Sequence, residues 1–199
     1  FIIIRSMMLT IIAHSLAACS LTMGYRTNER QPLIAKAPDN SGLYYDLYNS
    51  AAIKIGCTLK VERYPKKRVL HYMKQGHIDF YPGFNFTEVR AVNFFFLENG
   101  LTGGYVGVSS FQMQNITDLR QLVGKTVLQP RGSPDLFKGI DNIKSRKVSE
   151  MSTPYAISLI KRNVGDFFAY DKSSIEYYLA KDKITGIKIH PNCCGGDKP

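Results

Sequence analysis

The most constraining feature of this sequence is a hydrophobic pattern that switches repeatedly between the two-residue period of a strand and the 3.6-residue period of a helix. Gly56 and Gly76 each close a helical stretch, as glycine commonly does. Over the first half, the pattern predicts strand, helix, strand, helix and strand at residues 21–25, 43–55, 58–64, 65–76 and 78–81. This order is typical of a mostly parallel sheet with helices on its faces.

The second half of the chain repeats the alternation. The predicted elements are an extended stretch at 103–108, a short helix from 116, a strand at 125–129, a helix from Ser133–Pro134, a strand at Val148, a helix at 154–163, a strand at 166–170, a helix at 173–181 and a strand at 187–190. Two such units predict an α/β protein with two lobes, residues 20–104 and 105–199. A cleft between lobes, beyond the carboxyl ends of strands, is where such folds bind small ligands.

The charge of the chain indicates a basic surface and no specific partner. The 199 residues include 26 Lys and Arg against 16 Asp and Glu, a net charge of +10. These cations are scattered, and their densest cluster is Lys66-Lys67-Arg68, with no zinc-finger spacing or RNA-binding aromatic signature. We therefore expect a solvated basic surface and no nucleic-acid partner. The 44% hydrophobic content excludes a disordered chain.

Residues 1–19 are predicted to be a secretory signal. Arg5 precedes an apolar stretch over 7–18, which ends among small residues. The last four residues, Leu16-Ala-Ala-Cys19, also resemble the bacterial lipobox, which implies lipidation of Cys19 and a membrane contact through that anchor alone. Ordinary cleavage near Ala17 or Ala18 is the alternative. Either way, we expect a periplasmic or otherwise extracytoplasmic location.

The four cysteines leave several pairings open. In an oxidising compartment, Cys193 and Cys194 would form a disulfide with each other, or one of them would pair with Cys57. With Cys19 lipidated or removed, the three that remain leave one thiol free or paired beyond Pro199. The four histidines lie far apart without paired ligand spacing, so we predict no metal, no cofactor and no Ser/His/Asp catalysis.

Three side chains at predicted strand ends and helix starts carry suitable chemistry for a ligand. Arg90 can grip a carboxylate through its guanidinium fork, Ser133 stands at a predicted helix start, and Asp171 follows a hydrophobic strand. Each has a structural alternative: a surface pair with Glu88, a helix cap, and a cap of the helix 173–181, respectively. Together they supply the groups that an α-amino acid zwitterion requires.

An ordered set of motifs resembles a known family from Leu21 to the end. The motifs are Ser41-Gly-Leu-Tyr-Tyr-Asp-Leu47, Pro65-x2-Arg68-x-Leu70, Gly76-His-Ile-Asp79, Thr87-Glu-x-Arg90, Leu119 with Gly124-Lys125, Gly132-Ser133 and Asp166-x4-Asp171. They resemble bacterial periplasmic solute-binding protein family 3, the substrate-binding proteins of ABC importers for polar amino acids. The resemblance implies the type II periplasmic-binding-protein fold, with parallel or mixed sheets flanked by helices.

The resemblance also implies roles for individual residues. Arg90 and Ser133 would bind the ligand carboxylate, and Asp171 would bind its ammonium group. Further expected contacts are Gly83 and Asn85, with Tyr25 or Tyr45 lining the pocket. Pro134 lacks a backbone N–H, and the segment Tyr81–Phe84 is bulkier than the family pattern, so an organic acid or a peptide fragment is an alternative ligand.

The implied mechanism is binding followed by closure of the lobes about a hinge near Gly103-Gly104, with a membrane permease as partner. A periplasmic sensor or receptor domain, or an enzyme similar to cyclohexadienyl dehydratase, remains the alternative on this fold. Chains of this family normally cross back to the first lobe after the second. Because this sequence ends at Pro199, near the second crossover, we expect that return to be missing.

Overall fold

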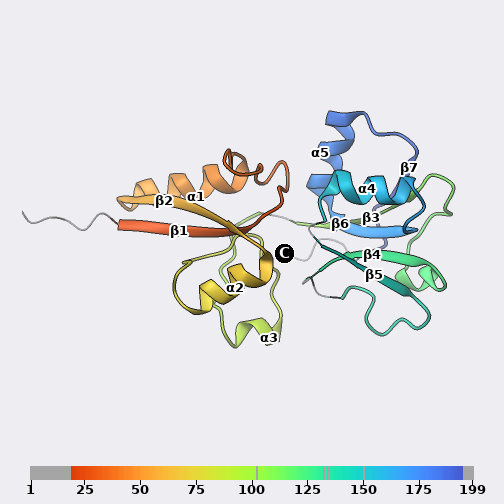
Figure 1. Ribbon diagram of the computed structural model, residues 1–199, viewed down its shortest axis with the longest axis horizontal. Coiled ribbons are helices and arrows are strands. Elements are labelled where there is room, and N and C mark those ends of the chain that lie inside the picture. Colours follow the sequence, from red (N-terminus) through yellow and green to blue (C-terminus); the bar gives the residue numbers. More distant parts are fainter. Residues whose placement is uncertain (1–18, 102, 132, 134, 150, 195–199) are drawn as a thin grey trace, which may run out of the picture.

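The computed structural model describes residues 19–101, 103–131, 133, 135–149 and 151–194. They form two α/β lobes, which agrees with the predicted fold class, and an irregular segment before Tyr105 joins them (Figure 1). The predicted secretory signal, apart from Cys19, lies outside the described residues. Within the described part of the chain, no helix is both long and apolar enough to cross a membrane.

Lobe 1 is built on a parallel pair of strands with helices on both sides (Figure 1). Its elements are β1 (Cys19–Arg26), α1 (Leu43–Lys54), β2 (Cys57–Tyr64), α2 (Lys66–Lys74) and α3 (Glu88–Ala91). Met23, Tyr25, Ile34 and Tyr44 form its buried core. Gly24 is required where β1 packs on α2, because a Cβ there would lie 2.8 Å from Val69 Cγ1 of α2 and 2.7 Å from Ile78 Cγ2.

The predicted strand at 78–81 is reduced to a single bridge between Phe80 and Met23. The side chain of Asp79 accepts the Thr22 N–H at 2.7 Å, in place of a carbonyl from the neighbouring strand. Pro82 and Gly83, whose φ is +64°, then turn the chain away. The side-chain hydrogen bond of Asp79 thus replaces one ladder bond before Phe80, and the turn at Pro82 and Gly83 ends the pairing after it.

The structure corrects the prediction for Cys19. This residue begins β1 and forms a disulfide with Cys57 at the start of β2. Since one sulfur cannot hold both a disulfide and a thioether-linked lipid, this pairing contradicts lipidation of Cys19. It also corrects the expected odd number of cysteines, because all four are paired: Cys193 bonds to Cys194.

Lobe 2 holds a mixed five-stranded sheet in the order β5-β4-β6-β3-β7. Its elements are β3 (Tyr105–Ser110), the 3-10 helix η1 (Leu119–Leu122), β4 (Thr126–Pro130), β5 (Lys144–Val148), α4 (Thr153–Lys161), β6 (Phe167–Asp171), α5 (Lys172–Asp182) and β7 (Ile187–His190). β4 runs parallel to β5 and β6, whereas β3 is antiparallel to β6 and β7. The mixed sheet flanked by helices confirms the predicted fold class.

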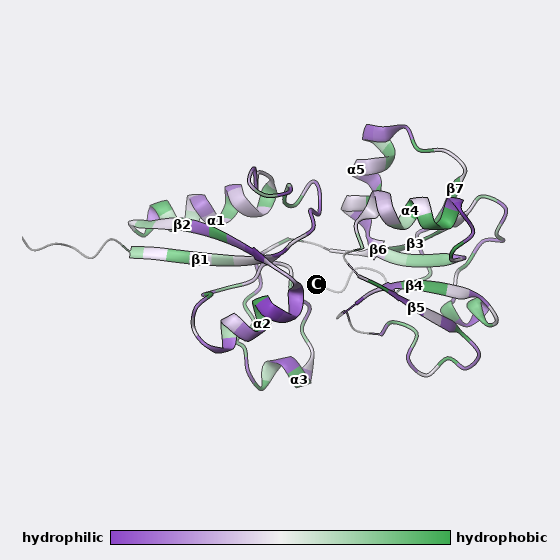
Figure 2. Cartoon of the chain, in the orientation of Figure 1, coloured by the Kyte–Doolittle hydropathy of each residue, from purple (hydrophilic) through white to green (hydrophobic). Residues whose placement is uncertain are grey.

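The central strand β6 is buried on both faces. Phe167 and Ala169 enter one core with Leu122 and Phe137, while Phe168 and Tyr170 enter the other, beneath α4 and α5. This alternation explains the continuous apolar run in the sequence. The edge strand β5 is exposed and hydrophilic along most of its length (Figure 2), which discourages pairing with another chain.

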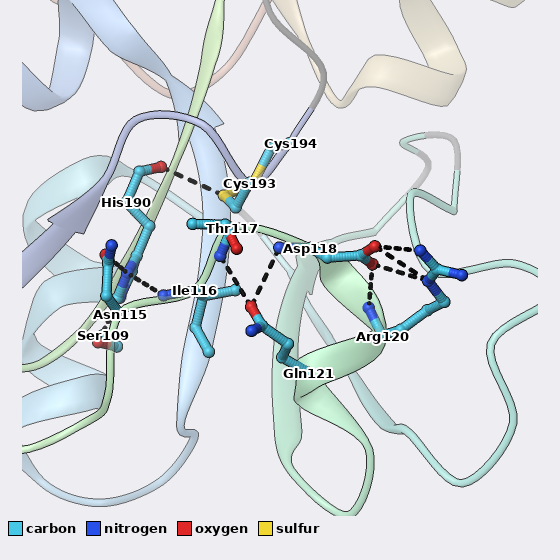
Figure 3. Close-up of a disulfide and its surroundings, with 10 residues drawn as sticks. All are labelled: Ser109, Asn115, Ile116, Thr117, Asp118, Arg120, Gln121, His190, Cys193 and Cys194. Carbon is cyan, nitrogen blue, oxygen red and sulfur yellow. Dashed lines mark hydrogen bonds and ion pairs between the residues drawn. A yellow bond between two sulfur atoms is a disulfide. The ribbon is translucent and has the colours of Figure 1, made fainter.

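His190, at the end of β7, anchors the last part of lobe 2 (Figure 3). Its Nδ1 accepts the backbone N–H of Ile116 at 3.0 Å, and its Nε2 lies 2.8 Å from Ser109 Oγ. Burial, and secondarily Lys188, lowers the pKa of His190, so the ring is neutral at neutral pH. The Cys193–Cys194 disulfide packs next to it.

The predicted helix starting at Ser133–Pro134 is wrong. Residues 136–139 form a turn. Asp135 accepts the backbone N–H of Phe137 at 3.1 Å and the side-chain amide of Gln129 at 2.6 Å. The bond from the Phe137 N–H to the Asp135 side chain closes a local turn, and the bond from Gln129 ties that turn to the end of β4.

Candidate functional site

A cavity of about 220 Å³ lies between the lobes, where several strands end. Lobe 1 contributes Arg26, Arg30, Lys66, Asn85 and Arg90, and lobe 2 contributes Tyr105, Gln129, Ser133 and Tyr170. Arg26 is the last residue of β1, and Lys66 follows β2 by two residues. The cavity thus occupies the place beyond strand carboxyl ends where α/β folds bind ligands.

Four of the seven predicted ligand-binding residues line this cavity: Gly83, Asn85, Arg90 and Ser133. The other three lie outside its lining. Tyr25 is 1% exposed and stacks on Tyr81, with ring centroids 5.1 Å apart. Tyr45 is half-buried on α1, and Asp171 is buried beneath the cavity wall.

Arg90 is held at the cavity by its own short helix. Thr87 caps α3, and its Oγ1 accepts the Arg90 N–H at 3.3 Å. The guanidinium donates from Nη1 to the Asn85 carbonyl at 2.8 Å and lies 4.1 Å from the Phe84 ring centroid. Burial lowers the pKa of Arg90, which nevertheless remains charged at any physiological pH. Its Nε and Nη2 have no hydrogen-bond partner among the described residues, so they can bind an anion.

Arg26 crosses from lobe 1 to lobe 2. It donates from Nη2 to the hydroxyl of Tyr170 on β6, and its Cζ lies 5.6 Å from the ring of Tyr170. Within the described part of the chain, its buried Nε has no hydrogen-bond acceptor. A buried N–H without an acceptor is costly, so this donor favours occupation of the cavity by an acceptor.

Arg30 pairs with Asp171 across the same boundary. Its Nη2 lies 2.9 Å from Asp171 Oδ2, and the two side chains are 13% and 9% exposed. The other carboxylate oxygen, Oδ1, accepts the Ser174 N–H at 3.0 Å and so caps α5. Both oxygens of Asp171 are therefore engaged, one of them in the helix cap that was the structural alternative for this residue.

Arg63 organises the loop that carries Arg26 and Arg30. Its guanidinium donates five hydrogen bonds, to Arg26 O, Thr27 O, Asn28 O, Ala35 O and Asn40 Oδ1, at 2.8 to 3.4 Å. It also lies 5.2 Å from the ring of Tyr25. These bonds satisfy backbone carbonyls that the loop would otherwise leave unpaired.

Lys66 completes the cationic side of the cavity. Burial, followed by the charges of Arg90, Arg26 and Arg30, lowers the pKa of Lys66 to about 8. Its Nζ lies 5.8 Å from the Phe84 ring centroid. The lowered pKa reflects several positive charges that share one poorly solvated space.

Ser133 lies in the loop after β4, and its backbone N–H donates to the Pro130 carbonyl at 3.2 Å. No helix follows in the described residues 135–143, so its hydroxyl does not stand at a helix N-terminus as predicted. Further contacts join the lobes: Tyr178 donates to Glu29 at 2.7 Å, and Asn85 donates to Tyr105 at 3.5 Å. The two lobes are therefore in contact around the cavity.

Sequence reasoning missed Arg26, Arg30 and Lys66. The rule that singled out Asp171, a polar residue ending a strand, applies equally to Arg26 at the end of β1. Lys66 is the first residue of α2, directly after Pro65, which is a comparable signal. Arg30 lies in an irregular loop, and no local pattern indicates that it reaches lobe 2.

No protein-family model matches the chain, and no curated protein sequence matches it significantly. Solved structures do match. An ancestral arginine-binding protein bound to arginine has a TM-score of 0.75 at 21% identity, covering 89% of this chain and 81% of that one. The holo arginine-binding protein of T. maritima has a TM-score of 0.75 at 21% identity, covering 90% and 80%.

A third similar structure is the substrate-binding protein of an amino acid ABC transporter, with a TM-score of 0.72 at 19% identity, covering 89% of this chain and 83% of that one. At these identities the likeness establishes the fold of the chain alone. The chain has the two-lobe type II fold of family 3 solute-binding proteins.

Proposed function

We propose that this protein is the substrate-binding component of an ABC importer and that it holds an amino acid or a similar small carboxylate between its lobes. The observation that carries the proposal is Arg90, whose Nε and Nη2 have no partner among the described residues and which lines the inter-lobe cavity. A guanidinium with a free edge is suited to a carboxylate. The similar structures are amino-acid-binding proteins, which supports the same role.

The mechanism is recognition and closure. Arg90 binds the ligand carboxylate from lobe 1, and the Ser133 hydroxyl contacts it from lobe 2. A ligand that touches both lobes stabilises the closed form by the contacts it makes only there. We propose that a membrane permease recognises the closed form and completes transport, a role that requires an extracytoplasmic location.

Binding without turnover is favoured over an enzyme. The similar solved structures are ligand-binding proteins. The polar groups of the cavity are cations, hydroxyls and amides, which hold an anion in place. The dehydratase alternative would be supported if the chain turned over an arogenate-like or prephenate-like compound.

Isothermal titration calorimetry of the purified full chain against a panel of amino acids and organic acids tests the proposal. We expect at least one carboxylate to bind and Arg90→Ala to weaken its affinity about tenfold or more, because a charge-assisted bond is lost. Arg68→Ala, at an exposed position on α2, is the matched control and should bind normally. The proposal fails if no member of the panel binds, or if Arg90→Ala binds as well as the native chain.

A further inference from the structure

The charged side chains described in the cavity lining are all positive. The described lining includes four cations, Arg26, Arg30, Lys66 and Arg90, and no aspartate or glutamate. An adjoining cavity of about 410 Å³ shares Arg26 and Lys66 and adds two more cations, again without a carboxylate among the residues described there. Such a site attracts anions and repels cations.

Only one of these four cations has its charge balanced. Arg30 pairs with Asp171, whereas Arg26, Lys66 and Arg90 have no ion pair with any described carboxylate. The buried Nε atoms of Arg26 and Arg30 also lack acceptors within the described residues. Three unpaired positive charges in one partly desolvated space are neutralised best by a ligand that carries more than one negative charge.

A ligand ammonium group finds no free carboxylate here. Arg30 occupies Oδ2 of Asp171, and Ser174 occupies Oδ1. The amide of Gln129, the buried polar group on the opposite wall, is also engaged, by Lys147 and Asp135. An ammonium or guanidinium would have to displace Arg30, which is tethered to the protein and so has a high effective concentration at Asp171.

We propose, on the basis of the proposed function, that the cleft selects small organic anions with two or more negative charges and no ammonium or guanidinium group, such as dicarboxylates or phosphorylated acids. One anionic group binds Arg90, and the second binds between Arg26 and Lys66. Arg30 takes the place at Asp171 that the resemblance assigned to the ligand ammonium. A cavity of about 220 Å³ suits a ligand smaller than a drug-sized molecule.

Calorimetry with isosteric pairs of ligands tests the charge requirement. Succinate and succinamate have nearly the same shape and differ by one negative charge. We expect succinate, or glutarate in the same comparison, to bind about tenfold or more tightly than its monoamide. L-arginine should not bind. Inorganic phosphate and glycerol 3-phosphate, run in parallel, distinguish phosphorylated ligands from dicarboxylates.

Variants then locate the second anionic group. Lys66→Met should weaken binding of the tightest dianion about tenfold while leaving its monoanionic analogue nearly unchanged. Lys74→Met, an exposed position on the same helix, is the control and should change neither. Circular dichroism checks that both variants are folded.

The outcomes separate the two proposals. If L-arginine or L-glutamine binds and no dianion does, the dianion inference is overturned and the importer proposal stands. If dianions and their monoamides bind equally, the charge requirement is wrong. If no amino acid, dicarboxylate or phosphate binds the folded chain, the proposed function itself fails.

Discussion

The ion pair between Arg30 and Asp171 should be a measurable link between the lobes. It spans 2.9 Å between side chains that are 13% and 9% exposed, so solvent screens it little. A hydrogen bond between charged groups of this kind contributes about 1.5–3 kcal/mol. Asp171→Asn removes the charge but keeps an N-cap residue for α5, because asparagine caps helices about as well as aspartate.

A double-mutant cycle isolates this contribution. The free energy of unfolding in urea is measured for the native chain, Asp171→Asn, Arg30→Gln and the double variant. We expect a coupling energy of about 1.5–3 kcal/mol. The ion pair forms only when the lobes are closed, so its loss should shift the population toward open molecules. Small-angle X-ray scattering should therefore show a larger radius of gyration for Asp171→Asn.

The exposed pair of Asp118 and Arg120 is the control for the cycle. Its side chains are 42% and 80% exposed, so its coupling energy should stay below about 1 kcal/mol. If the Arg30–Asp171 coupling is equally small and the radius of gyration is unchanged, the pair does not link the lobes. Asp171 would then be available to a ligand ammonium group.

Three further predictions concern pH, the disulfide and a glycine. A bound dianion raises the pKa of Lys66 from about 8, so the affinity for the dianion should be constant below pH 8 and fall as the pH rises above 8. Calorimetry across this pH range measures the affinity. The Lys66→Met variant should not show the fall. Replacing Cys19 and Cys57 with serine should lower the free energy of unfolding in urea by about 3–4 kcal/mol, because the disulfide closes a loop with a sequence separation of 38. An unchanged free energy would show that the disulfide does not form. Gly24→Val should lower the melting temperature, since its Cβ would lie 2.7 Å from Ile78 Cγ2, and a native Tm would contradict the close packing there.

Much of the fold was predictable because its elements follow simple periods. The strands β2 and β6 and the helices α1 and α4 have boundaries within a few residues of those predicted. Their local pattern and their burial agree, which makes them readable from one sequence. The exceptions are the absent helix after Ser133 and the shortened strand at Phe80, where the side chains of Asp135 and Asp79 bond the backbone.

The site was only partly predictable for a related reason. Arg90 and Asn85 lie close together in sequence on a turn and a short helix, so a local motif places them together. The role of Asp171 depends on Arg30, a residue 141 positions away on the other lobe. A contact between lobes produces no periodic pattern in the sequence. The sequence therefore identifies the Asp171 carboxylate as a candidate but does not indicate that Arg30 pairs with it.

A small anion should bind between the lobes against the arginines of lobe 1. An NMR titration of the arginine Nε–H signals with succinate, assigned by single Arg→Lys variants, tests this claim. We expect the signals of Arg90 and Arg26 to shift and saturate together. Those of Arg63, which is engaged by the loop, and of exposed Arg68 should stay in place. Binding that leaves Arg90 and Arg26 unmoved would contradict the claim.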